Sequence, residues 1–165
     1  MTNKYLFLAL MLMSFYSVAQ AKAEEQAIAK SLDQFHHAAA QANAQVYLDL
    51  LTPDAIFLGT DAAERWTKKQ FTDFVLPHFN QGNGWLYLVK ERNISLVENT
   101  NVAFFDEVLE NHKYGYCRGS GVLIKTEQGW KISQYNLSFL VPNDVAKKVV
   151  QQIKGYEKKN NAKID

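Results

Sequence analysis

The feature that most constrains the fold is a block of four strand-like segments joined by short turns. The segments are rich in aromatic and β-branched residues and cover residues 85–97, 102–110, 116–125 and 130–140. The turns between them are too short for crossovers, so neighbouring segments must pair as antiparallel hairpins. The sequence therefore predicts an antiparallel sheet in the second half of the chain.

The first half has the periodicity of helices. Apolar residues recur at spacings of three and four over residues 24–43, which predicts an amphipathic helix, and a short second helix is expected over residues 44–51. Thr67 and Gln70 have the spacing of a capping box, which opens a third helix. Helices followed by a curved antiparallel sheet predict an α+β domain with the helices on one face of the sheet.

Residues 1–21 have the three parts of a secretory signal. A positively charged start is followed by an apolar run over residues 5–13 and by small residues at the −3 and −1 positions. We expect cleavage after Ala21, with cleavage after Ala23 as the alternative. An uncleaved membrane anchor is a poorer interpretation, because the run is well short of the roughly 20 apolar residues that span a bilayer.

The expected organisation is a signal peptide followed by one domain. The domain covers residues 22–141, a C-terminal helix covers 142–157, and a polar, frayed tail covers 158–165. The mature protein is expected to be periplasmic or secreted, with no membrane contact once the signal is removed.

The charge balance and the cysteine content exclude some classes of protein. The chain has 18 Lys and Arg against 17 Asp and Glu, and removal of Lys4 with the signal makes the two counts equal. This balance does not predict a nucleic-acid partner. Cys117 is the only cysteine, so the exported domain has no internal disulfide and depends on packing for its stability.

Gly129 fixes the expected register of the last hairpin. A type I turn followed by a residue with positive φ places Gly129 third in a three-residue loop, so Thr126 should face Trp130. Arg118 then lies opposite Ser138.

Side chains alternate along strands, so this register predicts one mixed face of the sheet. Its apolar part, near the hairpin, contains Val122, Ile124, Trp130 and Ile132, and its polar part contains Tyr116, Arg118, Ser120, Asn136 and Ser138. Apolar walls with a few fixed polar groups are typical of a pocket between a sheet and its helices. Gly119 and Gly121 should then lie on the outer face, which suits solvent or a flat partner surface.

Arg118 has two interpretations. It is one of three arginines in the chain, and a covered arginine in mid-strand needs a carboxylate partner or an anionic ligand. The functional interpretation is that it orients a carboxylate or polar group of a ligand. The alternative is that the polar end of the sheet faces water and Arg118 pairs with Asp106 or Glu110.

Two blocks of sequence carry a family resemblance. Residues 59–67 (Gly-Thr-Asp-Ala-Ala-Glu-Arg-Trp-Thr) and the ending from Gly129-Trp130 to Tyr135-Asn-Leu-Ser138 occur in order, separated by a helix and the strands. With these blocks, residues 24–141 resemble the SnoaL-like branch of the nuclear transport factor two-like superfamily. The resemblance implies a cystatin-like α+β cone, a half-barrel whose strongly curved sheet wraps around N-terminal helices, with an internal pocket and frequent dimerisation through the sheet. It implies no single activity, because relatives include ketosteroid isomerases, polyketide cyclases and dehydratases.

One departure from the family pattern bears on activity. Relatives commonly carry a histidine where this chain has Asn136, and asparagine does not transfer protons near neutral pH. An isomerase, dehydratase or cyclase would therefore need Asp106 as its base, with Tyr116 and Asn136 as hydrogen-bond donors. Trp66 either caps the pocket or packs as a staple against the helix that follows it.

The histidines do not predict a metal site. His36 flanks the apolar stripe of the first helix and is at most a pocket-edge residue, whereas His37 is expected in solvent. Neither has metal-ligand spacing with His78 or His112, so we expect no metal and no cofactor.

Three functions remain open. The first is an exported pocket protein that binds a small-molecule ligand, and the second is an enzyme that uses Asp106. The third is an association module that forms a homodimer through the sheet. The asparagine at position 136 favours the first over the second.

Overall fold

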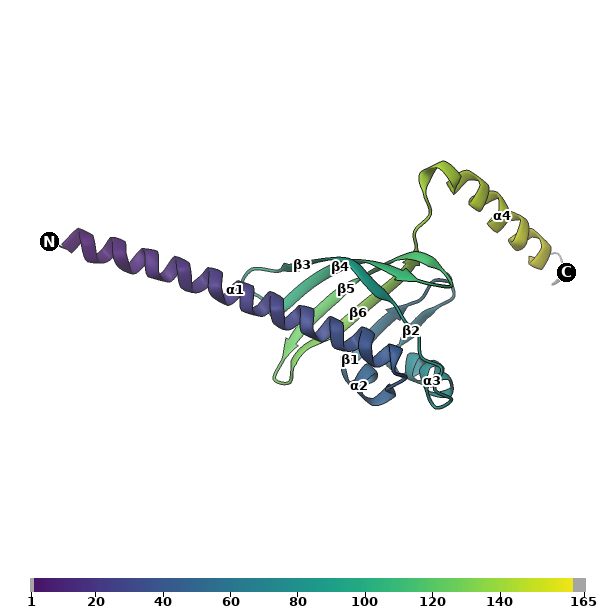
Figure 1. Cartoon of the computed structure of the whole chain (residues 1–165), viewed down its shortest axis with the longest axis horizontal. Helices are drawn as coiled ribbons and strands as arrows, with labels where there is room; N and C mark the ends of the chain where they lie inside the picture. Colours follow the sequence, from purple (N-terminus) through teal and green to yellow (C-terminus); the bar gives the residue numbers. More distant parts are fainter. Residues whose placement is uncertain (1, 162–165) are drawn as a thin grey trace.

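The structure is a computed structural model that describes residues 2–161, with side chains described for residues 19–159. Helix α1 (Thr2–Ala40) begins far outside the domain and then runs along the sheet (Figure 1). The apolar run of the expected signal, residues 5–13, lies outside the described side chains. No helix in the described part of the chain is long and apolar enough to cross a membrane.

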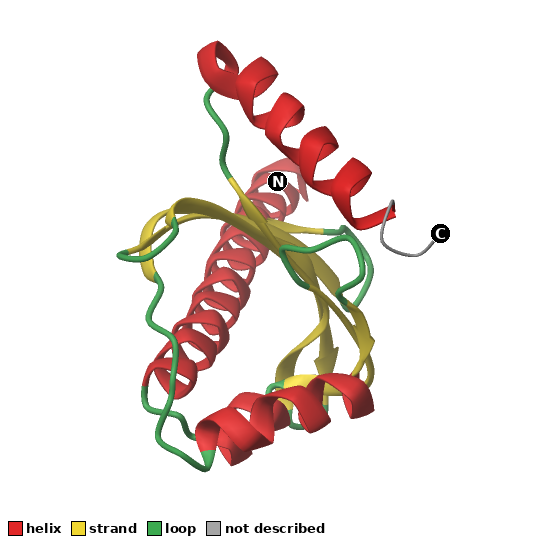
Figure 2. Ribbon diagram, turned by 90° about the vertical axis from the view of Figure 1, so that its right-hand side faces the viewer, coloured by secondary structure: helices red, strands yellow, loops and turns green. Residues whose placement is uncertain are grey.

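Six strands form one curved, unclosed sheet in the order β2-β1-β6-β5-β4-β3 (Figure 2). Their bounds are β1 Leu51–Leu58, β2 Arg65–Thr67, β3 Leu88–Leu96, β4 Val102–Asn111, β5 Gly115–Thr126 and β6 Gly129–Phe139. Strands β3 to β6 pair antiparallel as predicted, and β1 adds to β6 in parallel. The fold is thus the expected α+β half-barrel, in which the sheet curves around α1.

Two short helices complete the wall around the concave side of the sheet. Helix α2 (Ala44–Asp49) begins at Asn43, whose side chain accepts a hydrogen bond from the Val46 amide at 3.1 Å. Helix α3 (Lys68–Phe79) begins at the predicted capping box, in which the Thr67 amide donates to Gln70 Oε1 at 3.0 Å. The cap directs α3 across the open end of the sheet.

The core lies between α1 and the concave face of the sheet. Ile28, Leu32 and Phe35 follow the predicted helical spacing and are almost fully buried. They belong to the same apolar cluster as Phe105 and Leu123 of the sheet. Each such side chain contributes about 1.5 to 3 kcal/mol of burial free energy, so this contact fixes α1 against the sheet.

The pairing in the last hairpin differs from the predicted register, and this changes which side chains share a face of the sheet. Thr126 pairs with Gly129 rather than with Trp130, so the loop has two residues. A bulge at residue 133 then shifts the register by one, and Arg118 still pairs with Ser138 as predicted. The bulge reverses which side of β6 faces the core, because strand side chains alternate.

Because of this reversal, the apolar and polar groups predicted to share one face are divided between both faces. Trp130 and Ile132 are buried in the core on the concave side. The polar group, which holds Arg118, Ser120, Asn136 and Ser138, lies on the convex side, where each residue pairs directly across β5 and β6.

Gly119 and Gly121 also lie on the concave side, not on the outer face as predicted. A Cβ atom on Gly119 would lie 2.5 Å from the Tyr135 hydroxyl, and one on Gly121 would lie 2.9 Å from the Phe105 ring. Glycine is therefore required here by close packing inside the core, and neither position is available to a partner surface.

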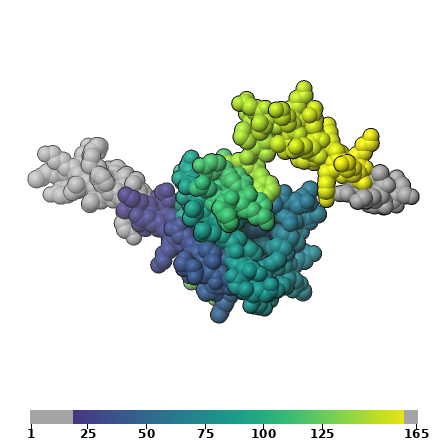
Figure 3. Space-filling model, turned by 45° about the vertical axis from the view of Figure 1, so that its right-hand side comes forward, coloured from purple at the N-terminus to yellow at the C-terminus, as the bar shows by residue number. Residues whose placement is uncertain are grey.

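Helix α4 (Asn143–Asn161) follows β6 and projects away from the domain. In the space-filling view it stands apart from the body of the molecule (Figure 3). Its apolar side chains are exposed, with Val145 at 41% and Ile153 at 50%.

Candidate functional site

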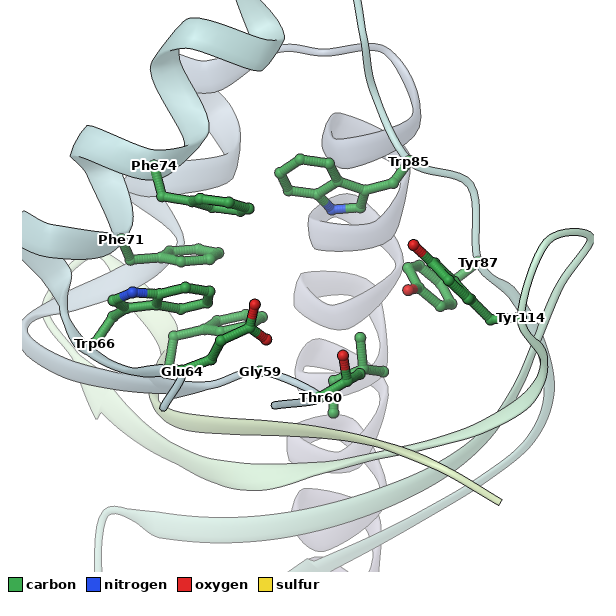
Figure 4. Close-up of a pocket in the computed structure, with 11 residues that line it drawn as sticks. Gly59, Thr60, Glu64, Trp66, Phe71, Phe74, Trp85, Tyr87 and Tyr114 are labelled. Atoms are coloured by element: carbon green, nitrogen blue, oxygen red, sulfur yellow. The ribbon is translucent and has the colours of Figure 1, made fainter. Parts of the chain in front are cut away.

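A cavity of about 240 Å³ opens on the concave side of the sheet, between α3 and the segment before β3 (Figure 4). Its lining is mostly aromatic and consists of Phe57, Gly59, Thr60, Glu64, Trp66, Phe71, Phe74, Trp85, Tyr87, Tyr114 and Leu137. No Lys or Arg is among these lining residues. The cavity therefore suits a flat apolar molecule better than an anion.

Helix α3 and β2 supply one wall of stacked rings. Trp66 stacks on Phe74, with ring centroids 4.8 Å apart, and Phe71 stacks on Phe57 of β1 at 3.9 Å. Trp66 thus lines the cavity and also packs on the helix that follows it.

Residues 84–87 form the opposite wall of the cavity. A close backbone contact with the end of α1 fixes the position of this segment. The Trp85 amide donates to the Ala39 carbonyl at the end of α1, at 3.1 Å. A Cβ on Gly84 would lie 2.4 Å from that same oxygen, so only glycine permits the approach. The Trp85 ring then lies next to Phe74, at 6.3 Å between centroids, and both rings line the cavity.

Asn111 holds the third side of the cavity. Its side-chain amide is buried and donates to the Leu86 carbonyl at 2.9 Å, and its oxygen accepts from the amides of Lys113 and Tyr114. One side chain therefore links the segment that carries Trp85 to the turn that carries Tyr114. Buried amides of this kind stabilise one conformation, because leaving any of the bonds unmade is costly.

Polar atoms lie at the rim of the cavity. The Glu64 carboxylate and the Thr60 hydroxyl come from the loop between β1 and β2, and the hydroxyls of Tyr87 and Tyr114 lie across from them (Figure 4). Burial raises the pKa of Tyr87 to about 12, so its hydroxyl stays a neutral donor at ordinary pH.

A second, much smaller cavity of about 20 Å³ adjoins the inner end of the first. The two share Phe57, Trp85, Tyr87 and Leu137 in their linings, and the small one adds Phe35, His36, Ala39, Tyr47 and Tyr135. It has room for one water-sized group. Burial raises the pKa values of Tyr47 and Tyr135 well above the ordinary range.

A buried network of ionisable groups lies behind the small cavity. Glu107, on the concave side of β4, is fully buried, and its Oε1 atom lies 2.8 Å from His36 Nε2. Its Oε2 atom accepts a hydrogen bond from Arg92 Nε at 2.8 Å. Arg92 in turn donates through Nη1 to Asp33 Oδ1 of α1 at 2.7 Å.

The network keeps Arg92 charged although the side chain is mostly buried. Burial lowers the pKa of Arg92, but Glu107 and Asp33 raise it by more, so the net shift is upward. Arg92 Nη2 also lies 2.7 Å from Glu107 Oε2 as an ion pair. It makes no hydrogen bond to any residue that the structure describes, so Nε makes the directional contact with the carboxylate.

The other residues named from the sequence lie away from both cavities. Tyr116, Arg118, Ser120, Asn136 and Ser138 line neither cavity, and Tyr116 is 54% exposed. Arg118 Nη1 donates to Asp106 Oδ1 at 3.0 Å on the convex face. The structure therefore agrees with the alternative interpretation of Arg118, in which it pairs with Asp106 on a water-facing side of the sheet.

Asp106 is likewise outside the cavity, with a half-exposed side chain. Its neighbour Glu107, which the sequence prediction did not name, is the fully buried carboxylate of the two. The available signal was the alternation of Ala103, Phe105 and Leu109, which places Glu107 on the buried side of the strand. His37 is exposed as predicted, whereas His36 is buried deeper than a pocket-edge residue.

In the described part of the chain, no group of three or more His, Cys, Asp or Glu residues is arranged to hold a metal ion.

Comparison with known proteins gives one family and many similar folds. The SnoaL-like domain matches residues 28–142. A nuclear transport factor two-like protein with a cystatin-like fold from Novosphingobium aromaticivorans superposes with a TM-score of 0.60 at 11% identity, covering 83% of this chain and 95% of its own.

Two further similar structures carry described activities. One is a candidate dehydratase of the same superfamily from Streptomyces avermitilis, with a TM-score of 0.61 and 10% identity over 74% of this chain and 99% of its own. The other is a candidate ketosteroid isomerase from Shewanella frigidimarina, with a TM-score of 0.55 and 18% identity over 68% and 94%. At these identities the likeness shows the fold alone. The search of curated proteins found no match.

Proposed function

Because the chain belongs to the SnoaL-like domain family, we propose that it is an exported protein whose aromatic cavity binds a small, flat and largely apolar molecule. The observation that carries the proposal is the aromatic lining of the cavity, to which both Phe74 and Trp85 contribute. Stacked and edge-on ring contacts favour a planar ligand beyond the area that it buries.

The polar rim sets the expected chemistry of the ligand. Glu64 brings a carboxylate, and none of the described residues that line the cavity is basic, so a neutral molecule with a hydroxyl or N–H donor fits better than an acid. We therefore do not propose that Arg118 orients an anionic group of the ligand, because Arg118 lies on the convex face. An enzyme built on Asp106 is set aside for the same reason.

Calorimetry with a planar probe tests the proposal. We expect 2-naphthol to bind the wild-type protein and the Phe74→Ala variant to bind it about 10-fold more weakly, which corresponds to about 1.4 kcal/mol. Tyr156→Ala is the matched control, because Tyr156 is an aromatic residue exposed on α4, away from the cavity, whereas Phe74 is 39% exposed at the cavity. Equal weakening by both variants, or by neither, would contradict the proposed site.

Export is proposed from the signal-like residues 1–21. Ala21 and Ala23, the two expected cleavage positions, are exposed on α1. Among the described side chains, the first that α1 uses to bond to the sheet is Glu24, which accepts a hydrogen bond from Trp130 Nε1 at 2.8 Å. Cleavage at either position therefore leaves the hydrogen bonds of Glu24 to the sheet intact.

The convex face supports a second proposal, self-association of two copies. Phe104 and Tyr116 are large, more than half exposed and on the same side of the sheet as Arg118. Burying such a surface in a two-fold contact would remove it from water. Phe104→Glu should then give a monomer by light scattering with an unchanged circular dichroism spectrum, and a wild-type protein that is already monomeric would contradict the proposal.

A further inference from the structure

Helix α4 begins directly after the residues that match the SnoaL-like domain, and the packing of the domain does not use it. The helix projects from the end of β6 and stands apart from the body of the molecule (Figures 1 and 3). None of its described side chains is buried, and none of the ion pairs among the described residues joins it to the domain. The sequence of α4 therefore needs another explanation than the core of the domain.

One side of α4 is apolar along most of its length. Val145, Val149 and Ile153 recur at a spacing of four, which keeps them on the same side of a helix. The complete apolar face consists of Val145, Ala146, Val149, Val150, Ile153 and Tyr156. Within this face Val150 is 47% exposed and Tyr156 is 70% exposed. An exposed apolar face on a helix that the domain does not cover indicates a contact outside the domain.

Lysines border the apolar face on both sides. With 3.6 residues per turn, Lys148 and Lys159 lie along one edge of the face, and Lys147 and Lys154 lie along the other. The helix carries five lysines against two carboxylates, a net charge of +3, and the carboxylates lie toward its two ends. An apolar face with basic edges is typical of helices that lie on a membrane surface.

We propose that α4 docks on an anionic lipid surface. Its valines, Ile153 and Tyr156 enter the boundary between the headgroups and the acyl chains, and the helix lies in the plane of that boundary without crossing it. The lysine side chains extend along the edges of the face, so their ammonium groups meet the lipid phosphates. Because residues 140–142 connect β6 to α4, this contact holds the domain and its cavity beside the membrane.

A second copy of the chain is the competing occupant, and the charges favour the lipid. Residues 22–142 hold 11 Lys and Arg against 14 Asp and Glu, so a second domain is weakly acidic. On its exposed convex face, however, Asp106 is already paired with Arg118 at 3.0 Å, and Glu110 is paired with Lys90 at 2.6 Å. The lysines of α4 would have to compete with these pairs, and two copies of α4 would repel each other. Lipid phosphates present no such competition.

The proposal does not rest on the cavity or on its ligand. Cleavage after Ala21 or Ala23 leaves α4 in place, because the helix lies at the opposite end of the molecule from the start of α1 (Figure 1). It departs from the sequence expectation that the mature protein has no membrane contact, which concerned the apolar run of the signal.

Co-sedimentation with vesicles tests the proposal on the mature chain from Lys22. Vesicles of phosphatidylcholine mixed with phosphatidylglycerol should bind the protein at low salt, and pure phosphatidylcholine should bind it on the order of 10-fold more weakly. The double substitution Val149→Gln and Ile153→Gln should lower partitioning to the anionic vesicles about 10-fold or more. Lys148→Gln combined with Lys154→Gln should lower it on anionic vesicles and leave the weak binding to neutral vesicles unchanged.

Val97→Gln is the matched control, because Val97 is an apolar residue of the domain that is 39% exposed. It should leave vesicle binding unchanged, and all variants should keep the thermal unfolding of the wild type, since α4 stands apart from the domain. Absence of binding to anionic vesicles, or binding that both α4 variants leave unchanged, would overturn the proposal. A dimer in light scattering that the Val149 and Ile153 variant dissociates, with vesicles unbound, would overturn it in favour of a second copy.

Discussion

His36 and Glu107 are separated by 71 positions in the sequence, and their side chains meet at 2.8 Å beneath the inner end of the cavity. Arg92 completes the contact from the other side of the carboxylate. This junction of α1, β3 and β4 is both a structural element of the core and the only part of the described ionisable network that reaches the ligand space.

The first prediction concerns the stability of this junction. Glu107→Gln removes the charge opposite a mostly buried Arg92, and breaking such a pair costs about 3 to 5 kcal/mol of unfolding free energy. Asp106→Asn makes the same chemical change one position away, in a half-exposed pair, and should cost at most about 1 kcal/mol. Urea denaturation of the two variants measures the difference. Similar losses would mean that Glu107 is not buried as described.

The second prediction tests the concave position of Gly119. Gly119→Ala places a methyl group against the Tyr135 hydroxyl and should cost about 1 to 3 kcal/mol through overpacking. Adding Tyr135→Phe removes the nearest atom and should recover part of this loss, giving a non-additive double-mutant cycle. Ser120→Ala, the neighbour on the convex face, is the control for strand propensity. If Gly119→Ala leaves the unfolding free energy unchanged, Gly119 lies on the outer face of the sheet, as the sequence predicted.

The third prediction follows from the raised pKa of Tyr87, about 12 in the folded protein. Because the folded pKa lies above the ordinary value of 10, the unfolded chain loses this proton first as pH rises. The stabilisation is complete below pH 10 and is lost between about pH 10 and 12. Tyr87→Phe should therefore flatten the fall of the unfolding free energy over this window in urea titrations. A parallel fall in both proteins would show that Tyr87 titrates normally.

The fourth prediction concerns maturation. Protein recovered from its native compartment should begin at Lys22 or Glu24 by intact-mass measurement, because the signal-like segment ends at Ala21 or Ala23. A version produced from Glu24 should keep the thermal stability of the version from Lys22, since the Glu24 contacts to Trp130 and Lys125 remain. A mature protein that retains Met1 would contradict export.

Local patterns in the sequence were enough to predict most of the fold. The capping box at Thr67 and Gln70 and the hairpins of the last four strands are set by contacts between residues close in the chain. The bulge at residue 133 leaves no comparable signal, and one inserted residue was sufficient to invert the predicted face of β6.

The candidate site was predicted less well, because its parts are distant in the sequence. Trp66 was placed at the pocket, but His36 was expected only at its edge and Glu107 was not considered. Their contact depends on how α1 crosses the sheet, which is a property of the packed core. Arg118 was named as a candidate ligand-binding residue because it is an arginine in mid-strand, although its carboxylate partner, Asp106, lies on the adjacent strand.

The central claim, that the aromatic cavity holds a planar ligand, is tested most directly by contacts between ligand and protein protons. With methyl-labelled protein and 2-naphthol, intermolecular nuclear Overhauser effects should connect the ligand to Leu137, which lines both cavities, and not to Val122 on the convex side of the sheet. Contacts to Val122 alone, or none to Leu137 at saturating ligand, would contradict the account.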